Sequence, residues 1–471
     1  MSELAIPLGL RWPDGALLAE AVAFDDLAKR ASNAVTALAA QPTATLPGWS
    51  FDVLGPAAPR DFGDPRSVGW GVVVGAADPE ADATLAALKP LLEHRGATDE
   101  SILRYPAGDE ADRADWIENF YLGLGDDRPR YLLLAGDPVQ LPFELQATLA
   151  SAGAAVGRVS FDDPTHLATY VAKVIAHEQV DAPYSTQSAI VWATDYGPND
   201  ATHYSAAYLA EPIARAIDKS ADFTVTQFSR DEATKQALLD SMSQRPGLVF
   251  TASHGMAAST NDGLAVQQRV NGAWCCARKP GMKDEDWLLT AEDVPADAPV
   301  WEGSVVIQFA CWGYGTPATS TFKQWTGQKT EVTAKQPFIA AIPKRLLANP
   351  RGPIGYVGHV DTAWLQGFDD PAHPIPDEDY SPRLEPMLTL VSRDLLDRSA
   401  SGYGLGDLAA KAAAIASEVS NFMNKIGGEG RSFKDLDGNE RRKLADRMIR
   451  RNDAMWFLFF GDPGVRIRVG T

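Results

Sequence analysis

The sequence predicts an α/β protein with a mainly parallel sheet, built as two consecutive α/β subdomains. Short apolar runs alternate with helical segments from "WGVVVG" (70–75) onward, which is typical of strands joined by helical crossovers. A second series of the same kind begins after "DAPYSTQ" (181–187). At 471 residues the chain is also long enough for two or three cores of about 150 residues.

The first subdomain is predicted over 67–185. Its strands are expected at 70–75, 130–136 and 155–160, with a helix over 80–95. A further helix should begin at Pro164, because Asp163 can cap its free amides and proline suits the first helical position. Residues 1–66 are rich in Ala, Pro and Asp with weak periodicity, so they are treated as an extension without an assigned role.

The second subdomain, 186–471, continues the alternation. "GLAVQQRVNGAWCC" predicts a hairpin that turns at Asn271-Gly272, and the polar stretch 316–336 predicts an exposed mobile loop. Strands are expected at 188–195, 223–229, 247–253, 304–311 and 352–360, a last one near 454–469, and helices at 204–219, 231–243 and 405–425, followed by a basic helix.

Charge and cysteine content limit the function classes. The 62 acidic residues against 43 basic ones argue against binding to nucleic acid or to an anionic membrane. No apolar run approaches the ~18 residues of a membrane span, and the N-terminus does not resemble a secretion leader. Three cysteines are too few for a disulfide scaffold. We therefore expect a cytoplasmic protein without a cofactor or catalytic metal, and a structural calcium ion stays open.

Two apolar runs end in residues that can carry chemistry. "VFTASHGM" (249–256) ends at His254, and "SVVIQFACWGYG" (304–315) reaches Cys311. In α/β sheets, ligands gather beyond the carboxyl ends of strands, so neighbouring strands would bring the imidazole and the thiol together. The imidazole can then activate the thiol for acyl transfer, while the amides of Gly255 and Cys311 form an oxyanion hole. Each residue alone could be structural, but the two patterns together favour a catalytic dyad.

The chain resembles the caspase–haemoglobinase clan of cysteine peptidases, and most closely its gingipain-type branch. Beyond the His-Gly and Ala-Cys pair, the resemblance rests on "YLLLAGDPVQLPF", "VGRVSFDDPTHLATYVAKVIAHE", "WATDYGPND", "GPIGYVGHVDTAW" and "FGDPGVRIR", and it spans roughly residues 70–471. It implies a caspase-like three-layer sandwich in which His254 is the general base and acid and Cys311 the nucleophile.

The same resemblance suggests residues for the S1 pocket. Asp195 in "WATDYG" matches the aspartate that binds a basic P1 side chain in arginine-specific gingipains, although a strand-end aspartate can also cap a turn or orient the histidine. Trp364 matches an aromatic residue over that pocket, or it belongs to the core. Asp361 and His359 could shape the pocket instead.

These observations predict an intracellular, bacterial cysteine endopeptidase that cuts a specific protein after Arg or Lys, in a regulatory or defence role. Activation by cutting at Lys323, Lys329 or Lys335 is a further hypothesis, and an activator or regulatory partner is left open. Two alternatives remain: a catalytically silent scaffold that binds a partner, and a cysteine hydrolase for small amides.

Overall fold

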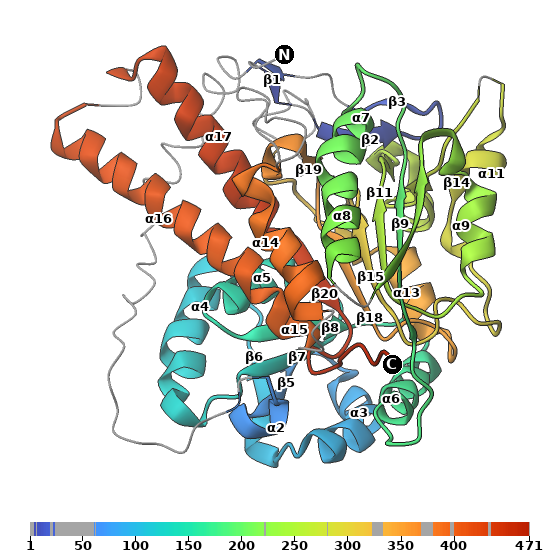
Figure 1. Cartoon of the computed structure of the whole chain (residues 1–471). Helices are drawn as coiled ribbons and strands as arrows, with labels where there is room; N and C mark the ends of the chain where they lie inside the picture. The colour runs from blue at the N-terminus through green and yellow to red at the C-terminus, as the bar shows by residue number, and fades with distance from the viewer. Residues whose placement is uncertain are drawn as a thin grey trace.

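The computed structural model describes residues 4–5, 7–18, 22–23, 61, 63–220, 223–279, 281–322, 333–368, 380–395, 400–431 and 435–470. Its centre is one ten-stranded sheet with the strand order β10-β9-β11-β15-β18-β20-β8-β7-β5-β6 (Figure 1). The strands are β5 (Trp70–Gly75), β6 (Ile102–Tyr105), β7 (Tyr131–Ala135), β8 (Ala155–Val159), β9 (Thr186–Ala193), β10 (Thr224–Ser229), β11 (Pro246–Ala252), β15 (Val305–Phe309), β18 (Gly355–His359) and β20 (Phe457–Phe460).

The strand β20 joins the two halves of this sheet. It pairs antiparallel with β18 and parallel with β8, whereas the strands within each half are parallel to one another. The halves β5–β8 and β9–β18 therefore run in opposite directions. As a result, their carboxyl ends lie at opposite edges of the sheet.

Helices cover both faces, so the predicted caspase-like three-layer sandwich is confirmed. In β5, Val72 and Val74 pack into one core cluster and Val73 into another, as expected when successive side chains point to opposite faces. One layer holds α3 (Ala81–Arg95), α6 (Pro164–His177) and α13 (Ala341–Ala348), and the other holds α5 (Phe143–Ser151), α8 (Glu211–Lys219), α14 (Glu385–Leu388) and α16 (Gly406–Gly428). The helix α6 begins as predicted, because the Asp163 side chain accepts a hydrogen bond from the Thr165 amide.

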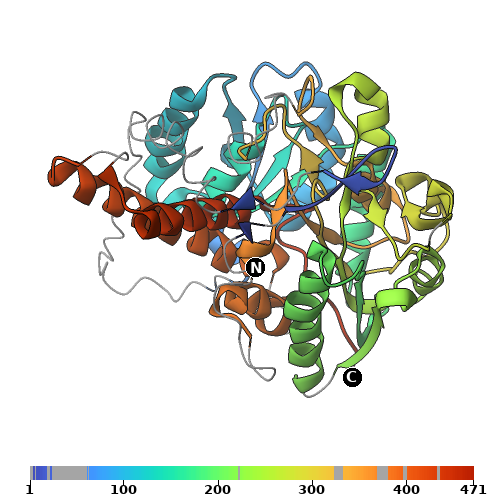
Figure 2. The ribbon, with the colours of Figure 1, turned by 90° about the horizontal axis from the view of Figure 1, so that it is seen from above.

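A second, smaller sheet lies at one edge of the second half. Its order is β14-β13-β12-β2-β19, with β3 paired to β2. Figure 1 shows the dark blue β2 close to β19, and Figure 2 shows the dark blue strands from above. The strands of this sheet are β2 (Pro7–Arg11), β3 (Ala16–Leu17), β12 (Gly255–Ala257), β13 (Trp274–Cys275), β14 (Leu288–Leu289) and β19 (Ala363–Trp364). The N-terminal extension, which the sequence left without a role, thus supplies a central strand of this sheet.

The remaining elements are short, apart from one long helix. The helix α17 (Gly438–Met455) packs along α16 and is capped by Asp437, which accepts from the Glu440 amide. The others are β1 (Leu4–Ala5), β4 (Val22–Ala23), β16 (Gly315–Thr316), β17 (Phe338–Ile339), α2 (Pro65–Val68), α4 (Glu110–Asp115), α7 (Ala201–Ser205), α9 (Lys235–Ser241), α10 (Leu264–Val270), α11 (Asp284–Trp287) and α15 (Ser401–Gly404).

The predicted hairpin at 263–276 is wrong in its first half. Residues 264–270 form the helix α10, because Gln267 and Val270 share one buried face and the Gln267 amide group donates to the Ala258 carbonyl at 3.0 Å. The turn at Gly272 is present, with a φ of 77°. A side chain there would overlap the backbone of Trp312, so glycine is required.

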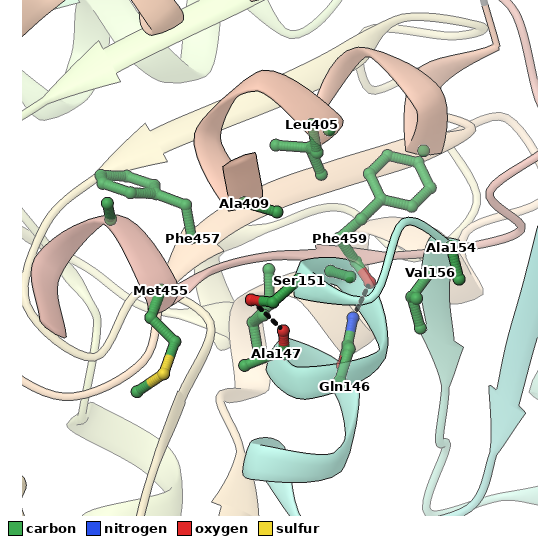
Figure 3. A pocket seen from close by; sticks show the side chains of 15 residues that line it. Gln146, Ala147, Ser151, Ala154, Val156, Leu405, Ala409, Met455, Phe457 and Phe459 are labelled. Atoms are coloured by element: carbon green, nitrogen blue, oxygen red, sulfur yellow. Dashed lines mark hydrogen bonds between the residues drawn. The ribbon is translucent and has the colours of Figure 1, made fainter. Parts of the chain in front are cut away.

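A small cavity lies where α5 meets α16 and β20 (Figure 3). Its volume is about 20 Å³, which is room for about one water molecule. The Gln146 side chain donates to the Phe459 carbonyl at 2.9 Å, and the Ser151 hydroxyl donates to the Ala147 carbonyl at 3.0 Å. These polar groups already have hydrogen-bond partners, so we interpret the cavity as a small packing defect between the sheet and its helices.

Across the described ranges, no helix combines the length and the apolar character that a membrane span requires.

Candidate active site

His254 and Cys311 lie beyond the carboxyl ends of two neighbouring strands. The strands β11 and β15 are paired in parallel, with Ala252 opposite Phe309, and each of the two residues follows two positions later. At the next position, a side chain on Gly255 would overlap the backbone of Cys311. Only glycine allows this close approach, so the two strand ends meet as the sequence predicted.

The imidazole of His254 is held from one side by a carboxylate. His254 is fully buried, and its Nε2 lies 2.8 Å from Asp200 Oδ1. Asp200 is fixed in turn as the N-cap of α7, where it accepts from the Thr202 amide at 2.8 Å and from the Thr202 hydroxyl at 2.6 Å. Among the described residues, His254 Nδ1 has no hydrogen-bond partner. One ring nitrogen is therefore oriented, and the other is available for proton transfer.

The sequence did not predict the contact between Asp200 and His254. Burial acts to raise the pKa of the Asp200 carboxyl, but the hydrogen bond and charge of His254 and the bonds from Thr202 outweigh it, so the pKa lies below its usual value. Asp200 stays ionised at neutral pH and can stabilise a protonated imidazole. The sequence "NDAT" (199–202) is typical of a helix start, with Asp200 as the cap. It does not indicate a contact between Asp200 and His254, which lies 54 positions away.

The thiol of Cys311 is fully buried. Burial raises its pKa well above the usual value, although the backbone amides of Ala363 and Leu8 hydrogen-bond the sulfur and act to lower it. The Ala363 nitrogen lies 3.2 Å from Sγ. In this arrangement the thiol is protonated, which is a weakly nucleophilic state.

Asp195 lies at the carboxyl end of β9, the strand next to β11. Its Oδ1 accepts from the Gly197 amide at 2.8 Å, and its Oδ2 lies 3.1 Å from His203 Nδ1 and 3.6 Å from Arg230 Nε. The Arg230 side chain is 72% exposed, so its ion pair with Asp195 is weak. The carboxylate is at the predicted edge of the sheet, and its S1 role stays a prediction.

Asp361, in the loop after β18, and Trp364, in β19, lie on either side of Ala363, whose amide bonds the Cys311 sulfur. Trp364 is buried and packs against Phe322, with ring centroids 5.4 Å apart. The Asp361 carboxylate is also buried and accepts from the Ser320 hydroxyl and the Thr321 amide, each at 2.8 Å. An S1 role for Asp361 would require this loop to rearrange, so its contacts favour an architectural role.

The other predicted positions divide into three groups. Lys335 is exposed, whereas Lys323 and Lys329 fall outside the described residues. His359 is buried against Phe457 and bonds the Asp453 carbonyl at 3.2 Å. Cys275 and Cys276 are free and buried, as ordinary core residues would be. Within the described ranges, no group of three or more His, Cys, Asp or Glu side chains could hold a metal ion.

A thiol and a carboxylate-bound imidazole at adjacent strand ends of a three-layer α/β sandwich define the class of a caspase-like cysteine peptidase. The model of Peptidase family C25 matches residues 97–468. The chain therefore belongs to this family, the gingipain family, and is a cysteine peptidase. No curated protein matches the chain.

Three solved structures are similar over most of the chain. The Arg-specific cysteine proteinase gingipain R is 13% identical, with 88% of this chain and 81% of that one covered and a TM-score of 0.48. The complex of the pro- and mature domains of RgpB from Porphyromonas gingivalis is 11% identical, with 85% and 81% covered and a TM-score of 0.46. A further protease structure is 13% identical, with 85% and 79% covered and a TM-score of 0.49.

Proposed function

We propose that this peptidase cuts polypeptides after Arg or Lys, with His254 and Cys311 as its catalytic dyad and Asp200 as the residue that positions the imidazole. The observation that carries the proposal is the parallel pairing of β11 with β15, which places His254 and Cys311 at adjacent strand ends, with His254 Nε2 2.8 Å from Asp200 Oδ1. The proposed chemistry uses protein side chains, backbone amides and water only.

The first half of the reaction forms an acyl-enzyme. His254 Nδ1 takes the proton from the Cys311 thiol, and the thiolate attacks the substrate carbonyl carbon. The carbonyl oxygen becomes an oxyanion, which the amides of Gly255 and Cys311 stabilise. As the C–N bond breaks, the imidazolium gives its proton to the leaving amine. Asp200 stabilises the positive charge of the ring between these two transfers.

The second half regenerates the enzyme. Water loses a proton to His254 Nδ1 as its oxygen attacks the thioester carbon, and the C–S bond breaks. The proton then returns from His254 to the Cys311 sulfur, and the product leaves as a carboxylic acid. The same imidazole therefore serves as base and acid in each half-reaction, which requires one orientation throughout.

Preference for a basic P1 residue is proposed to come from Asp195, with Trp364 as the aromatic residue that would cover the S1 pocket. A carboxylate next to the general base can form charge-assisted hydrogen bonds with a guanidinium or an ammonium group. A substrate arginine would replace Arg230, which is largely exposed and bound only at 3.6 Å. Gingipain R, one of the similar structures, is described as Arg-specific, which supports the same preference here.

We further propose a cytoplasmic, bacterial enzyme that cuts a specific protein partner in a regulatory or defence role. The three cysteines are free thiols, which suits a reducing compartment. The net charge of −19 favours a basic partner segment over nucleic acid. Cell fractionation checks the compartment, and recovery of the protein only from an exported fraction would contradict it.

Peptide acyloxymethylketone probes with Arg, Lys, Asp or Leu at P1 test the reaction and its specificity. The Arg and Lys probes should label Cys311, and the Cys311→Ala variant should not be labelled. Equal labelling by the Asp or Leu probe would remove the assignment of Asp195. Labelling at Cys275 or Cys276 instead would remove the assignment of the nucleophile.

A further inference from the structure

The N-terminal strand β2 fills a slot directly over the proposed nucleophile. It pairs in parallel with β12, with Gly9 opposite Gly255, and antiparallel with β19, with Leu8 opposite Ala363. Both neighbours belong to the active site, since Gly255 follows His254 and the Ala363 amide bonds the Cys311 sulfur. Without β2, the facing backbone groups of β12 and β19 would have no strand between them.

The middle of β2 contacts the sulfur. A side chain placed on Gly9 would put its first carbon 3.5 Å from Cys311 Sγ and 3.3 Å from Trp312 Cζ3. The Leu8 backbone amide hydrogen-bonds the same sulfur. The side chains of Leu8 and Leu10 are buried, at 0% and 1% exposed. The complete burial of His254 and Cys311 therefore coincides with a strand of this same chain lying across them.

We propose that the slot between β12 and β19 is the binding site for an extended peptide substrate, and that β2 keeps the enzyme latent by occupying this slot as a strand. The proposal rests on the dyad proposed above. A peptide would bind by strand addition, so its backbone would replace the hydrogen bonds that β2 makes and its scissile carbonyl would take the place next to the thiol.

The residues of β2 indicate that the slot opens by displacement and not by cutting. The residue beside the thiol is glycine, flanked by two leucines, which does not match a basic P1 preference. The Gly9 carbonyl accepts a hydrogen bond from the Leu18 amide at 2.9 Å, so it is engaged within the β2–β3 hairpin. The nearest basic residue, Arg11, pairs with Asp14 at 2.6 Å. Thus β2 binds in a substrate-like position without presenting a bond that the enzyme would cleave.

A matched pair of full-chain variants tests this proposal. Leu10 and Leu17 are opposite each other in the β2–β3 pair, but Leu10 is 1% exposed and Leu17 is 47% exposed. Leu10→Asp places a charge in the buried slot and should expel β2, whereas Leu17→Asp makes the same change in solvent. We expect iodoacetamide to alkylate Cys311 about 100-fold faster in Leu10→Asp than in Leu17→Asp. Cleavage of an Arg peptide should rise with it.

A synthetic peptide of residues 4–18, added to the Leu10→Asp variant, provides a second test of the latency proposal. It should slow both alkylation and cleavage in Leu10→Asp, and the same peptide with Asp at position 10 should not. Equal alkylation rates in the two variants would overturn the latency proposal. Fast alkylation of Cys311 without cleavage of any basic peptide would support latency and overturn the proposed peptidase specificity, so the two failures can be told apart.

Hydrogen exchange on the unmodified protein covers the case in which Leu10→Asp unfolds. Unfolding would show as alkylation of Cys275 and Cys276 together with Cys311. In the unmodified protein, a displaceable strand should open locally, so the amides of 8–11 should exchange well before those of β11. Exchange of both segments at the same slow rate would mean that β2 is a permanent part of the sheet, and the proposal would fail.

Discussion

In both halves of the central sheet, loops follow the carboxyl ends of parallel strands, but the residues at these strand ends differ between the halves. At the carboxyl ends of β5, β7 and β8 lies an open cavity of about 310 Å³. Its lining includes no histidine or cysteine, and its acidic residues are Asp78, Glu80, Asp137 and Asp162. At the carboxyl ends of β11 and β15, at the opposite edge, His254 and Cys311 are buried under β2.

Parallel sheets offer a crevice at each such edge, but the residues at the strand ends decide what happens there. At the first edge, Asp137 accepts from the Val139 and Gln140 amides, and Asp162 pairs with Lys344 at 2.7 Å. These acids serve local structure. At the second edge a carboxylate is hydrogen-bonded to an imidazole instead, and this is the edge at which we propose that the reaction takes place.

The largest expected effect comes from Cys311→Ala in the Leu10→Asp background. Peptide cleavage should fall by about 10⁴-fold or more, because alanine lacks the thiol that forms the proposed acyl-enzyme. Asp137→Asn at the first edge and Cys276→Ala next to the site should each retain activity within about twofold. Activity is measured as the initial rate on an Arg peptide. If Asp137→Asn loses as much activity as Cys311→Ala, the two edges do not differ in function.

In the same Leu10→Asp background, Asp200→Asn should lower kcat by about 100-fold or more while KM changes little. The amide can still cap α7, but it lacks the charge that stabilises the imidazolium. Steady-state kinetics separate the two constants, and the thermal midpoint controls for folding. A loss confined to KM would place Asp200 in substrate binding.

The effect of Asp195→Asn should depend on the substrate. Loss of a charge-assisted bond of about 1.5–3 kcal/mol lowers kcat/KM for Arg and Lys peptides by about 10- to 100-fold and leaves poor Leu substrates unchanged. Asp231→Asn, an exposed neighbour, is the matched control. Equal losses on all substrates would indicate that Asp195 supports the fold or the histidine.

Tyr314→Phe tests whether the two halves cooperate. Tyr314 follows the nucleophile by three residues, and its hydroxyl lies 3.0 Å from Gln146 Oε1 of the first half and 3.2 Å from the Phe459 carbonyl. Its loss should cost about 1–3 kcal/mol of unfolding free energy and lower kcat about fivefold. Tyr208→Phe on the surface should change neither, and an unchanged kcat in Tyr314→Phe would mean that the first half does not position the nucleophile.

The smallest effect concerns acid stability. Because the folded-state pKa of Asp200 is below its unfolded value of about 3.9, its contribution is present above that value and is lost as the pH falls through the folded-state pKa. Urea unfolding between about pH 5 and pH 3 should therefore show a smaller decline of the unfolding free energy in Asp200→Asn than in the unmodified protein. An unchanged decline would indicate that the lowered pKa is not coupled to folding.

Local signals explain what the sequence could predict. The strand ends at His254 and Cys311, the cap at Asp163 and most central strands depend on short apolar runs and on residues next to one another in the chain. The parallel pairing of neighbouring strands then brings the dyad together with little further information.

Long-range contacts explain what the sequence could not predict. The strand β2 is five residues long and pairs with residues about 250 and 350 positions away, and no periodicity within residues 7–11 encodes those partners. The contact between Asp200 and His254 depends on where α7 begins relative to β11. In 264–270, alternating and helical apolar patterns could not be told apart over seven residues, and burial of Gln267 and Val270 selected the helix.

The position of β20 also has a consequence for biosynthesis. Residues 457–460 leave the ribosome after all the other strands, yet they occupy the seam between β18 and β8. Until they emerge, the two halves of the sheet have no strand to join them, and such long-range pairing forms slowly. The growing chain therefore carries Cys311 before the sheet that supports it is complete, so we expect the site to assemble only after residues 457–460 have emerged.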